Sequence, residues 1–436
     1  MSIFDRQGIP ISLLRKSTSQ LDFDNALTPL LSFSLVRPEI GMQSFEMHRL
    51  VQLSTRRWLE TDKQLHEWTK KSIRTLATAF PSGYYDTWEE CRVLLPHARE
   101  VMNHGPGDDE DALNQAEIAL NLGNYLDLRG EYKAAENIFR LSVTVREKAL
   151  GKEHIDTLWA MDNLAKSLRD QGKLADSERL YRETLDGMEK AVGREHQITI
   201  STVGDLAVTL LELGQYDEAE QLQRWKLKGR ENTLGREHLG TLEAANALAA
   251  TLLRQDKYDE AESLYRWALG GREKALSMQH PTTLNTVGNL AVTLMVLRKH
   301  TEAEQLDRRA LDGREKLLGR EHPVTLTGVH NLAGTLQVQS KFADAEQLYL
   351  RVLEASEKVL GTEHPDTLGT MHCLAYLYHQ LKRYDAASKL YQSAYDGYVK
   401  TLGPNHPTTI DCSNGFKKME EERSHFKAKG HHRAST

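Results

Sequence analysis

One motif recurs down most of this chain at a fixed spacing, and it constrains the fold more than any other feature. The pattern Gly-x-Glu-His-x-x-Thr-Leu, with some variation, places a histidine every 42 residues. A period of this length, repeated seven times, predicts a solenoid in which each unit buries its apolar face against its neighbours. The histidines are His154, His196, His238, His280, His322, His364 and His406.

Each repeat unit is predicted to form two antiparallel helices. In the third unit, Gly214 separates two segments with helical periodicity, and the second segment runs from Tyr216 to Gly235. The histidine motif then falls in the tight turn before the next unit, where we interpret it as a turn and helix-capping element. A metal-binding interpretation is weaker, because histidines spaced along a solenoid form a row and not one centre. The first segment has one apolar face, at i, i+3, i+4 and i+7: Val203, Leu206, Ala207 and Leu210.

Composition narrows the class of protein. The formal net charge of −6 gives no electrostatic footprint for nucleic acid, so we do not expect a nucleic-acid partner. No run approaches the ~18 apolar residues of a membrane span, and the first residues lack a secretory pattern. The three cysteines are too scattered for a disulfide framework or a metal-site spacing. We therefore expect a soluble cytoplasmic protein without cofactors.

The first hundred residues differ in kind from the repeats. Helical spacing over 23–31 is followed by two short strands, predicted at 33–36 and 44–47 around a turn at 37–41, and by a helix over 49–60. Helix, hairpin and helix together predict a small winged-helix-like unit. Two further helices are expected, over 62–80 and 87–103.

The repeat positions resemble a known family. A small-Leu-Ala triplet on the first helix, and a Tyr-x-x-Ala such as the one at 265–268 on the second, look like the tetratricopeptide repeat. The 42-residue form with Leu-Gly-x-Glu-His-Pro-x-Thr-Leu resembles kinesin light chains and their fungal relatives. The resemblance covers roughly residues 112–410 and implies an all-α, right-handed superhelical solenoid of seven helix-turn-helix repeats.

A second resemblance lies in the N-terminal segment. The stretches at 4–10, 45–53 and 94–98 look like the segment that joins the nucleotide-binding module to the repeats in fungal STAND proteins, which resemble NLR receptors. In that family a Met-His-Asp motif brings its histidine to the nucleotide phosphate, and His48 matches this histidine, although Arg49 replaces the aspartate. The chain has no Gly-x-x-x-x-Gly-Lys-[Ser/Thr] loop to hold phosphates. His48 is thus either an orphan nucleotide sensor or a histidine at a strand end.

These patterns predict three segments. Residues 1–104 form the winged-helix-like and linker-helix module, a STAND remnant; residues 112–410 form the seven repeats; residues 411–436 form a capping helix and a disordered tail.

The predicted binding site is the groove of the solenoid, lined by the first helix of each repeat. One residue beyond the core stripe lies the stripe 204, 208, 211, about 100° around the helix. Equivalent positions are charged in the second unit, apolar in the third to fifth, and rich in histidine in the sixth and seventh. The alternative is that these side chains pack between repeats. The candidates are Asp162, Lys166, Arg169, Val208, Leu211, Asn246, Ala250, Leu253, Val292, Met295, His330, Gln337, His372, Tyr376 and His379.

Four kinds of function remain in comparison. The leading hypothesis is a non-enzymatic scaffold that binds a peptide or amphipathic helix in the groove, as a truncated STAND/NLR-like signalling protein or a stand-alone scaffold. A cargo adaptor like a kinesin light chain is the second, although no heptad coiled coil precedes the repeats. Part of a nucleotide-driven STAND switch is the third, and the missing phosphate-binding loop disfavours it. The fourth and weakest is a winged helix that binds DNA, supported only by a modest basic cluster: Arg56, Arg57, Lys63, Lys70, Lys71 and Arg74. The sequence leaves the partner, the pathway and the oligomeric state open.

Overall fold

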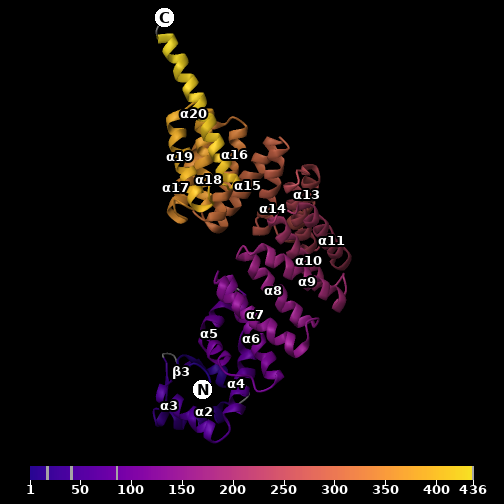
Figure 1. Cartoon of the computed structure of the whole chain (residues 1–436), viewed down its shortest axis with the longest axis vertical. Helices are drawn as coiled ribbons and strands as arrows, with labels where there is room; N and C mark the ends of the chain where they lie inside the picture. Colours follow the sequence, from indigo (N-terminus) through magenta and orange to yellow (C-terminus); the bar gives the residue numbers. More distant parts are fainter. Residues whose placement is uncertain (16–18, 40–42, 85–86, 435–436) are drawn as a thin grey trace. The chain divides into compact units, whose positions relative to one another are not determined.

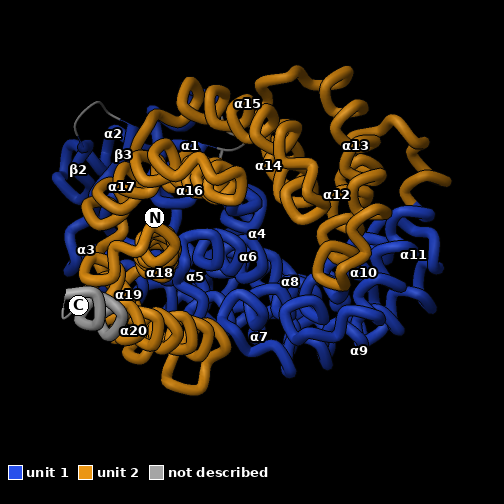
Figure 2. Tube along the Cα trace, turned by 90° about the horizontal axis from the view of Figure 1, so that it is seen from above, with its two compact units in different colours: residues 1–229 blue, residues 230–436 orange. Residues whose placement is uncertain are grey.

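The computed structural model of the chain is built almost entirely of helices, which confirms the predicted all-α class (Figure 1). It describes residues 1–15, 19–39, 43–84 and 87–434. The chain divides into two compact units, residues 1–229 and residues 230–436, which are coloured separately in Figure 2.

The N-terminal module combines a small sheet with five helices. The sheet has the strand order β1-β3-β2, and both pairings are antiparallel. The strands are β1 Ile9–Pro10, β2 Val36–Pro38 and β3 Ser44–Met47. The helices are α1 Ile11–Leu14, α2 Gln20–Ser32, α3 Arg49–Thr61, α4 Leu65–Ala79 and α5 Trp88–Met102.

The predicted hairpin is present, but its first strand begins later than expected. Residues 33 and 34 close α2 instead: Ser34 adopts φ 55°, and the amide of Leu35 donates to the carbonyl of Leu30 at 2.9 Å. Strand β1 was not anticipated, because Ile9 and Pro10 are too few for a periodic pattern. The turn was predicted at 37–41, but residues 37 and 38 belong to β2, and residues 40–42 fall outside the described residues.

The module and the first repeat share one hydrophobic core. Ile73 and Leu76 of α4 and Cys91 of α5 are buried in the same cluster as Ile118 and Leu122 of α6. Both α4 and α5 pack against α6. The predicted boundary at residue 104 therefore separates segments that bury each other's apolar side chains.

Seven helix pairs follow, each with a first helix (A) and a second helix (B) joined by a tight turn. In the first, second and fourth to seventh pairs, the A and B helices make the most extensive contacts between elements. The pairs are α6 Asp109–Leu128 with α7 Tyr132–Leu150, α8 Ile155–Asp170 with α9 Leu174–Val192, α10 Gln197–Glu212 with α11 Tyr216–Leu234, α12 Leu239–Arg254 with α13 Tyr258–Ala275, α14 Pro281–Val296 with α15 His300–Leu318, α16 Pro323–Val338 with α17 Phe342–Val359, and α18 Pro365–Gln380 with α19 Tyr384–Thr401.

The recurring histidine motif forms the turn from each B helix to the next A helix, as predicted. In the turn before α12, Gly235 has φ +85°, a conformation that glycine adopts without strain. Its carbonyl oxygen accepts a hydrogen bond from the hydroxyl of Thr241 at 2.7 Å. The imidazole of His238 caps α12 by accepting from the amide of Gly240 at 3.0 Å. One motif thus ends a helix, turns the chain and starts the next helix.

Within each unit, successive A helices lie closer to one another than successive B helices do. In unit 2, α12, α14, α16 and α18 contact each other in series, and in unit 1 α6, α8 and α10 do the same. The A helices are therefore the inner layer of each stack. Ion pairs tie the B helices together on the other layer: Lys173 to Glu136 at 2.6 Å, Lys299 to Glu262 at 2.7 Å, Lys341 to Glu304 at 2.6 Å and Arg383 to Glu346 at 2.8 Å.

The last helix, α20, runs over Pro407–Ala434 and packs against α19. It begins inside the segment assigned to the repeats and continues as helix through most of the expected tail; residues 435–436 lie outside the described residues. Among the residues described, no helix combines the length and apolarity needed to cross a membrane.

Candidate partner-binding face

The predicted groove residues fall into three rows along the A helices, and the structure places the rows differently. The first row, equivalent to Gly204, lies between repeats. Asp162 is buried and accepts a hydrogen bond from the hydroxyl of Thr202, on the next A helix, at 2.7 Å. A Cβ at Gly204 itself would meet the ammonium of Lys226 at 2.7 Å. Asn246 is half-buried, and its amide oxygen has no hydrogen-bond partner within the described ranges.

The row equivalent to Leu211 also turns toward neighbouring repeats. Leu211 packs against a buried cluster of unit 1, and Leu253 and Met295 are half-buried. Gln337 is buried and donates to the side chain of Gln380 in the next repeat at 2.7 Å. His379 is buried and lies 3.0 Å from the carboxylate of Glu422 on α20. In these two rows the structure favours packing between repeats.

The middle row, equivalent to Val208, borders solvent on the inner layer. Its members Lys166, Val208 and Val292 are half-buried, and Tyr376 is 49% exposed. Two positions that the sequence analysis did not select, each one residue after a predicted position, also reach solvent: Asp205 is half-buried and Glu212 is exposed. The outward stripe of an A helix is thus 205, 208, 212 and not 204, 208, 211.

In unit 2 this outward stripe is apolar on three successive A helices. Val296 of α14 is 40% exposed, Val338 of α16 is 54% exposed, and Tyr376 lies on α18. The half-buried primary amides of Asn289 and Asn331 lie about two helical turns before these valines, on α14 and α16. We call the side chains of Val296, Val338 and Tyr376 the inner apolar stripe.

In unit 1 the corresponding face is charged. Asp205 lies 3.6 Å from the guanidinium of Arg169, which also bonds Asp170. Burial and the charge of Asp205 together raise the pKa of the Asp162 carboxyl to about 7, against the effect of the hydrogen bond from Thr202. Burial likewise raises the pKa of Asp205, and Arg169 opposes that rise.

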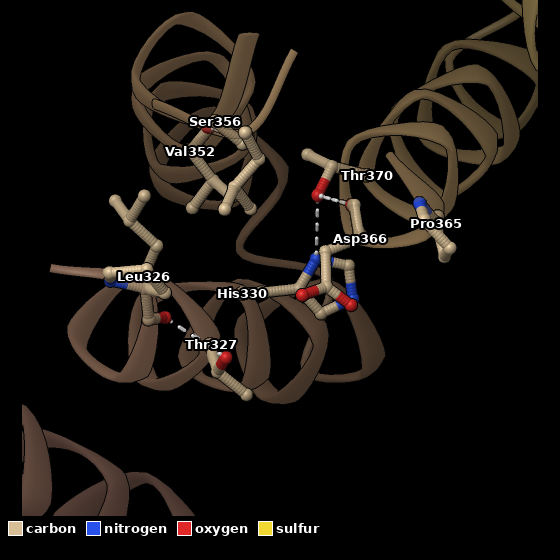
Figure 3. Close-up of a pocket in the computed structure, with 11 residues that line it drawn as sticks. Leu326, Thr327, His330, Val352, Ser356, Pro365, Asp366 and Thr370 are labelled. Carbon is tan, nitrogen blue, oxygen red and sulfur yellow. Dashed lines mark hydrogen bonds between the residues drawn. The ribbon is translucent and has the colours of Figure 1, made fainter. Parts of the chain in front are cut away.

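A small hollow opens between α16, α17 and α18, and no side chain of the inner apolar stripe lines it (Figure 3). Its volume is about 140 Å³, its walls include Leu326 and Val352, and Asp366 stands at its edge. The ring of His330 lines it and points toward Thr370, with Nδ1 and the hydroxyl oxygen 3.3 Å apart. Because the Thr370 hydroxyl donates to a backbone carbonyl at 2.9 Å, Nδ1 of His330 is the donor in this contact.

The remaining histidines of this end are held by aromatic neighbours. Burial lowers the pKa of both His330 and His372. His372 packs against Tyr391 and Tyr398, with ring centroids 5.7 and 6.5 Å apart. These contacts give the histidines a packing role. Within the described ranges, no three His, Cys, Asp or Glu side chains gather as a metal site.

His48, the candidate nucleotide sensor, occupies the same local structure as the repeat histidines. It is the N-cap of α3, and its Nδ1 accepts from the amide of Leu50 at 3.2 Å. Helix capping is therefore enough to explain why a histidine stands at this position. The nucleotide-sensing role has no further support among the described residues.

Comparison with known proteins agrees with this architecture. A tetratricopeptide-repeat model matches residues 114–190, 156–232, 204–274, 328–398 and 366–428, and a second one matches residues 283–324. A nucleotide-binding leucine-rich repeat (NLR)-like protein of Hyaloscypha variabilis is 33% identical over 164 residues, which is 37% of this chain. The chain corresponds to only 16% of that relative's length.

Solved structures show the same kind of fold. The apo quorum sensor NprR from B. thuringiensis has a TM-score of 0.58 at 13% identity, over 87% of this chain and 99% of that chain. A STAND (Signal Transduction ATPase with Numerous Domains) protein with a tetratricopeptide repeat sensor, from Pyrococcus horikoshii, has a TM-score of 0.51 at 14% identity, over 91% and 61%. The nearly identical TPR-like repeats of a putative kinesin light chain from Podosopora anserina are 25% identical, over 48% of this chain and 98% of that chain, with a TM-score of 0.43.

The helix pairs, their turns and the inner layer define a helical-repeat protein of the solenoid class. The repeat models cover more than half of the sequence, so the chain belongs to the tetratricopeptide repeat family. Repeats of this family generally serve as non-enzymatic protein-interaction scaffolds, and this chain has that architecture.

Proposed function

We propose that this chain is a non-enzymatic cytoplasmic scaffold that binds a peptide or an amphipathic helix along the inner apolar stripe of unit 2. The supporting observation is the placement of Val296, Val338 and Tyr376 on three successive A helices, all of them partly exposed. An apolar strip on an otherwise polar surface is typical of a site that a partner covers. Its one-per-helix spacing suits an extended peptide or a helix that crosses the A helices.

Two asparagines on helices of the stripe add the polar contacts that such a partner needs. Asn289 and Asn331 each carry an amide that donates and accepts, which matches the paired N–H and C=O groups of a peptide backbone. The hollow lined by Leu326 and Val352 has room for one aliphatic side chain. Backbone pairing would give affinity, and the hollow would give selectivity for the residue that enters it.

In the first step of the test, peptides that bind the full chain are selected from a random peptide display library. Peptides that use the stripe should lose about tenfold or more in affinity on Val338→Glu, because a carboxylate would then be buried against apolar groups. The matched control is Leu350→Glu, at a residue of α17 that is 45% exposed on the B-helix layer. Selected peptides that respond equally to both changes would contradict the proposal.

A cytoplasmic location is part of the same proposal. Cys91, Cys373 and Cys412 are all free thiols, which is the normal state of cysteine in a reducing compartment. Localisation of a fluorescent fusion checks it.

A further inference from the structure

The sixth repeat departs from the others at one position of its B helix. Counted at the 42-residue period, this position is arginine in four of the seven repeats, whereas Ser356 stands there in the sixth. Two further repeats carry other large side chains, Met188 and Tyr398. A serine is too short to fill the space that these side chains fill. The four arginines are Arg146, Arg230, Arg272 and Arg314.

Two of these arginines show where the side chain goes. Arg272 of α13 is buried and donates to the carbonyl of Thr282 at 3.0 Å and to the hydroxyl of Thr286 at 2.6 Å, both on α14. Arg314 of α15 is also buried and reaches α16, where a Cβ on Gly328 would meet its guanidinium at 3.0 Å. Each arginine thus extends from its B helix to the A helix of the next repeat.

In the sixth repeat the corresponding space is the hollow between α16, α17 and α18 (Figure 3). Ser356 forms part of its wall. Asp366 and Thr370 also line it, and they are the counterparts, two repeats further on, of the two threonines that bond Arg272. The hollow therefore keeps the positions that hold a guanidinium in the fourth repeat, but it lacks the arginine.

His330 occupies only part of this space. It stands one repeat after Gly288, where an added Cβ would meet the guanidinium of Arg314 at 3.1 Å. Its ring turns toward Thr370 and packs edge-on against Tyr349, with the ring centroids 5.4 Å apart. A volume of about 140 Å³ stays open. A cavity of ~150 Å³ accepts a molecule as large as benzene, so a planar guanidinium fits.

The charge in the lining of the hollow is negative. Asp366 carries it, since burial lowers the pKa of His330 and keeps that ring neutral. The Asp366 carboxylate lies 3.8 Å from Nδ1 of His364, but this nitrogen accepts from the Asp366 amide and has no proton to donate. On α17, Arg351 and Lys358 already pair with glutamates. Among the residues that the structure describes, no lysine or arginine pairs with Asp366, so its carboxylate is open to a cation from outside.

We propose that this hollow binds the guanidinium of an arginine in the partner peptide, in the place that the chain's own arginine fills in other repeats. The aliphatic stem of that arginine lies on Leu326 and Val352, and its planar head pairs with Asp366. Thr327, which lines the hollow, precedes Asn331 by one helical turn, so the hollow adjoins the face that carries Asn331. The inference rests on the proposed function, because it names one side chain of the peptide.

The hollow is tested by itself with a blocked tripeptide, acetyl-Gly-Arg-Gly-amide, added to the full chain with isotope-labelled methyl groups. The probe should shift the NMR signals of the Leu326 and Val352 methyl groups saturably. The same tripeptide with citrulline in place of arginine keeps the shape and lacks the charge, so it should bind about tenfold more weakly. If a leucine tripeptide shifts these signals as strongly as the arginine tripeptide does, the hollow takes an aliphatic side chain and the proposal is wrong.

Two substitutions locate the bound arginine. Ser356→Arg should place the chain's own arginine in the hollow and abolish the response to the probe, whereas Ser356→Ala should preserve it. Asp366→Asn should weaken the probe about fivefold, because an exposed ion pair is lost. The matched control is Asp156→Asn, at an exposed aspartate that follows the capping histidine of the second repeat in the same way, and it should have no effect.

Selected peptides extend the test to the proposed function. Peptides that bind the full chain should contain an arginine whose change to citrulline lowers affinity about tenfold, and Asp366→Asn should remove most of that difference. Peptides that respond to Val338→Glu but not to citrulline contradict the arginine site alone. Peptides that ignore Val338→Glu, together with a tripeptide response that Ser356→Arg abolishes, contradict the proposed function alone.

Three further results would overturn the arginine site. They are the absence of any shift with the arginine tripeptide, an equal shift with the citrulline tripeptide, and a folded Ser356→Arg chain that still responds to the probe. If Ser356→Arg does not fold, Asp366→Asn and its control decide, and equal binding to both would contradict the proposal.

Discussion

The imidazole of His238 and the amide of Gly240 form a helix cap, with Nδ1 accepting from the backbone nitrogen at 3.0 Å. The first amides of a helix have no partner within the helix, and an acceptor from the preceding residue satisfies one of them. The same bond recurs at every other A helix except α6, which Asp108 caps, and also at α20, because the same histidine precedes each of these helices. Its distance is 3.2 or 3.3 Å at His154, His196, His280, His322, His364 and His406.

This cap gives a first prediction about stability. His238→Ala should lower the free energy of unfolding by about 1 kcal/mol, because the amide of Gly240 loses its acceptor. His238→Asn should lose much less, since asparagine is itself a preferred cap. Glu237→Ala, at the adjacent exposed residue, is the control for a change in the turn. Urea unfolding of the three variants measures the differences, and equal effects of Ala and Asn would contradict a capping role.

The ion pairs between B helices give a second prediction. Glu136 bonds both Lys173 and Arg140, and although burial alone would raise its pKa, these bonds lower it to about 2. A lowered pKa means stability that is present above pH ~4.5 and is lost as the pH falls toward 2. Glu136→Gln should therefore destabilise the chain by about 1 kcal/mol at pH 7.

The pH dependence of that difference separates it from a packing effect. The difference in the free energy of unfolding between Glu136→Gln and the unchanged chain should decrease as the pH falls from 4.5 to 2. At pH 7, 0.5 M salt should also reduce this difference. Glu147→Gln, at an exposed residue of the same helix, should have no comparable effect. Thermal unfolding across pH checks both expectations.

Asp162 gives a third prediction, in which stability depends on pH in the opposite direction from that of Glu136. Its pKa is raised to about 7 by burial and by Asp205, so the ionised form is disfavoured in the folded chain. A raised pKa means stability that is full below pH ~4 and is lost as the pH rises toward 7. Asp162→Asn keeps an acceptor for Thr202 and removes the charge.

The variant should therefore be more stable than the unchanged chain at pH 8, by on the order of 1 kcal/mol. The two should converge near pH 4. Chemical denaturation at both pH values checks this, and a variant that is less stable at pH 8 would show that the carboxylate is well compensated by Arg169 and Lys166.

The repeats were predictable from sequence because their local signals agree. Glycine at positive φ, the histidine cap and the threonine-to-glycine bond lie within seven consecutive residues, so each turn is determined locally. The apolar positions between turns then have a single helical period. Neither feature depends on distant contacts.

The binding face was less predictable because it depends on how neighbouring repeats approach each A helix. Each A helix packs against its own B helix and against the repeats before and after it. Its buried face is therefore wider than a single stripe of residues. Asp162 and His379 looked like groove residues by spacing, but Thr202 and Glu422 from following helices cover them. Only contacts between repeats reveal this.

The apolar groove that α2, α3 and α4 line in the N-terminal module did leave a signal in the sequence. Val51, Trp58 and Leu59 lie at i, i+7 and i+8, so they form an apolar helical face. The sequence analysis did not single out this face. The sequence could not show that Trp58 stays exposed, since that depends on how α2 packs across α3.

A fourth prediction distinguishes two apolar positions of the A helices. Leu253 is half-buried, whereas Val338 is 54% exposed. Leu253→Glu should lower the melting temperature by several degrees, because it places an unpaired charge against packed side chains. Val338→Glu should leave it nearly unchanged. Differential scanning fluorimetry checks both, and equal melting temperatures would mean that Leu253 is as open to solvent as Val338.

The shared core of the N-terminal module and the first repeat gives the last prediction. Removal of residues 1–108 would expose Ile118 and Leu122 of α6, which the buried side chains of α4 and α5 now cover. Because each repeat of a solenoid is stabilised by its neighbours, the loss should be greatest at the new end and fade along the array. In the fragment 109–436, α6 and α7 should therefore lose most of their protection from hydrogen exchange, whereas α14 to α19 should keep theirs and act as the internal control. The newly exposed apolar side chains should also lower the solubility of the fragment. Ile118→Ser should restore its solubility without restoring the hydrogen-exchange protection of α6. Full protection of α6 in the fragment would show that the first repeat needs no cap, and that residues 1–108 are a separate domain joined to a self-sufficient array.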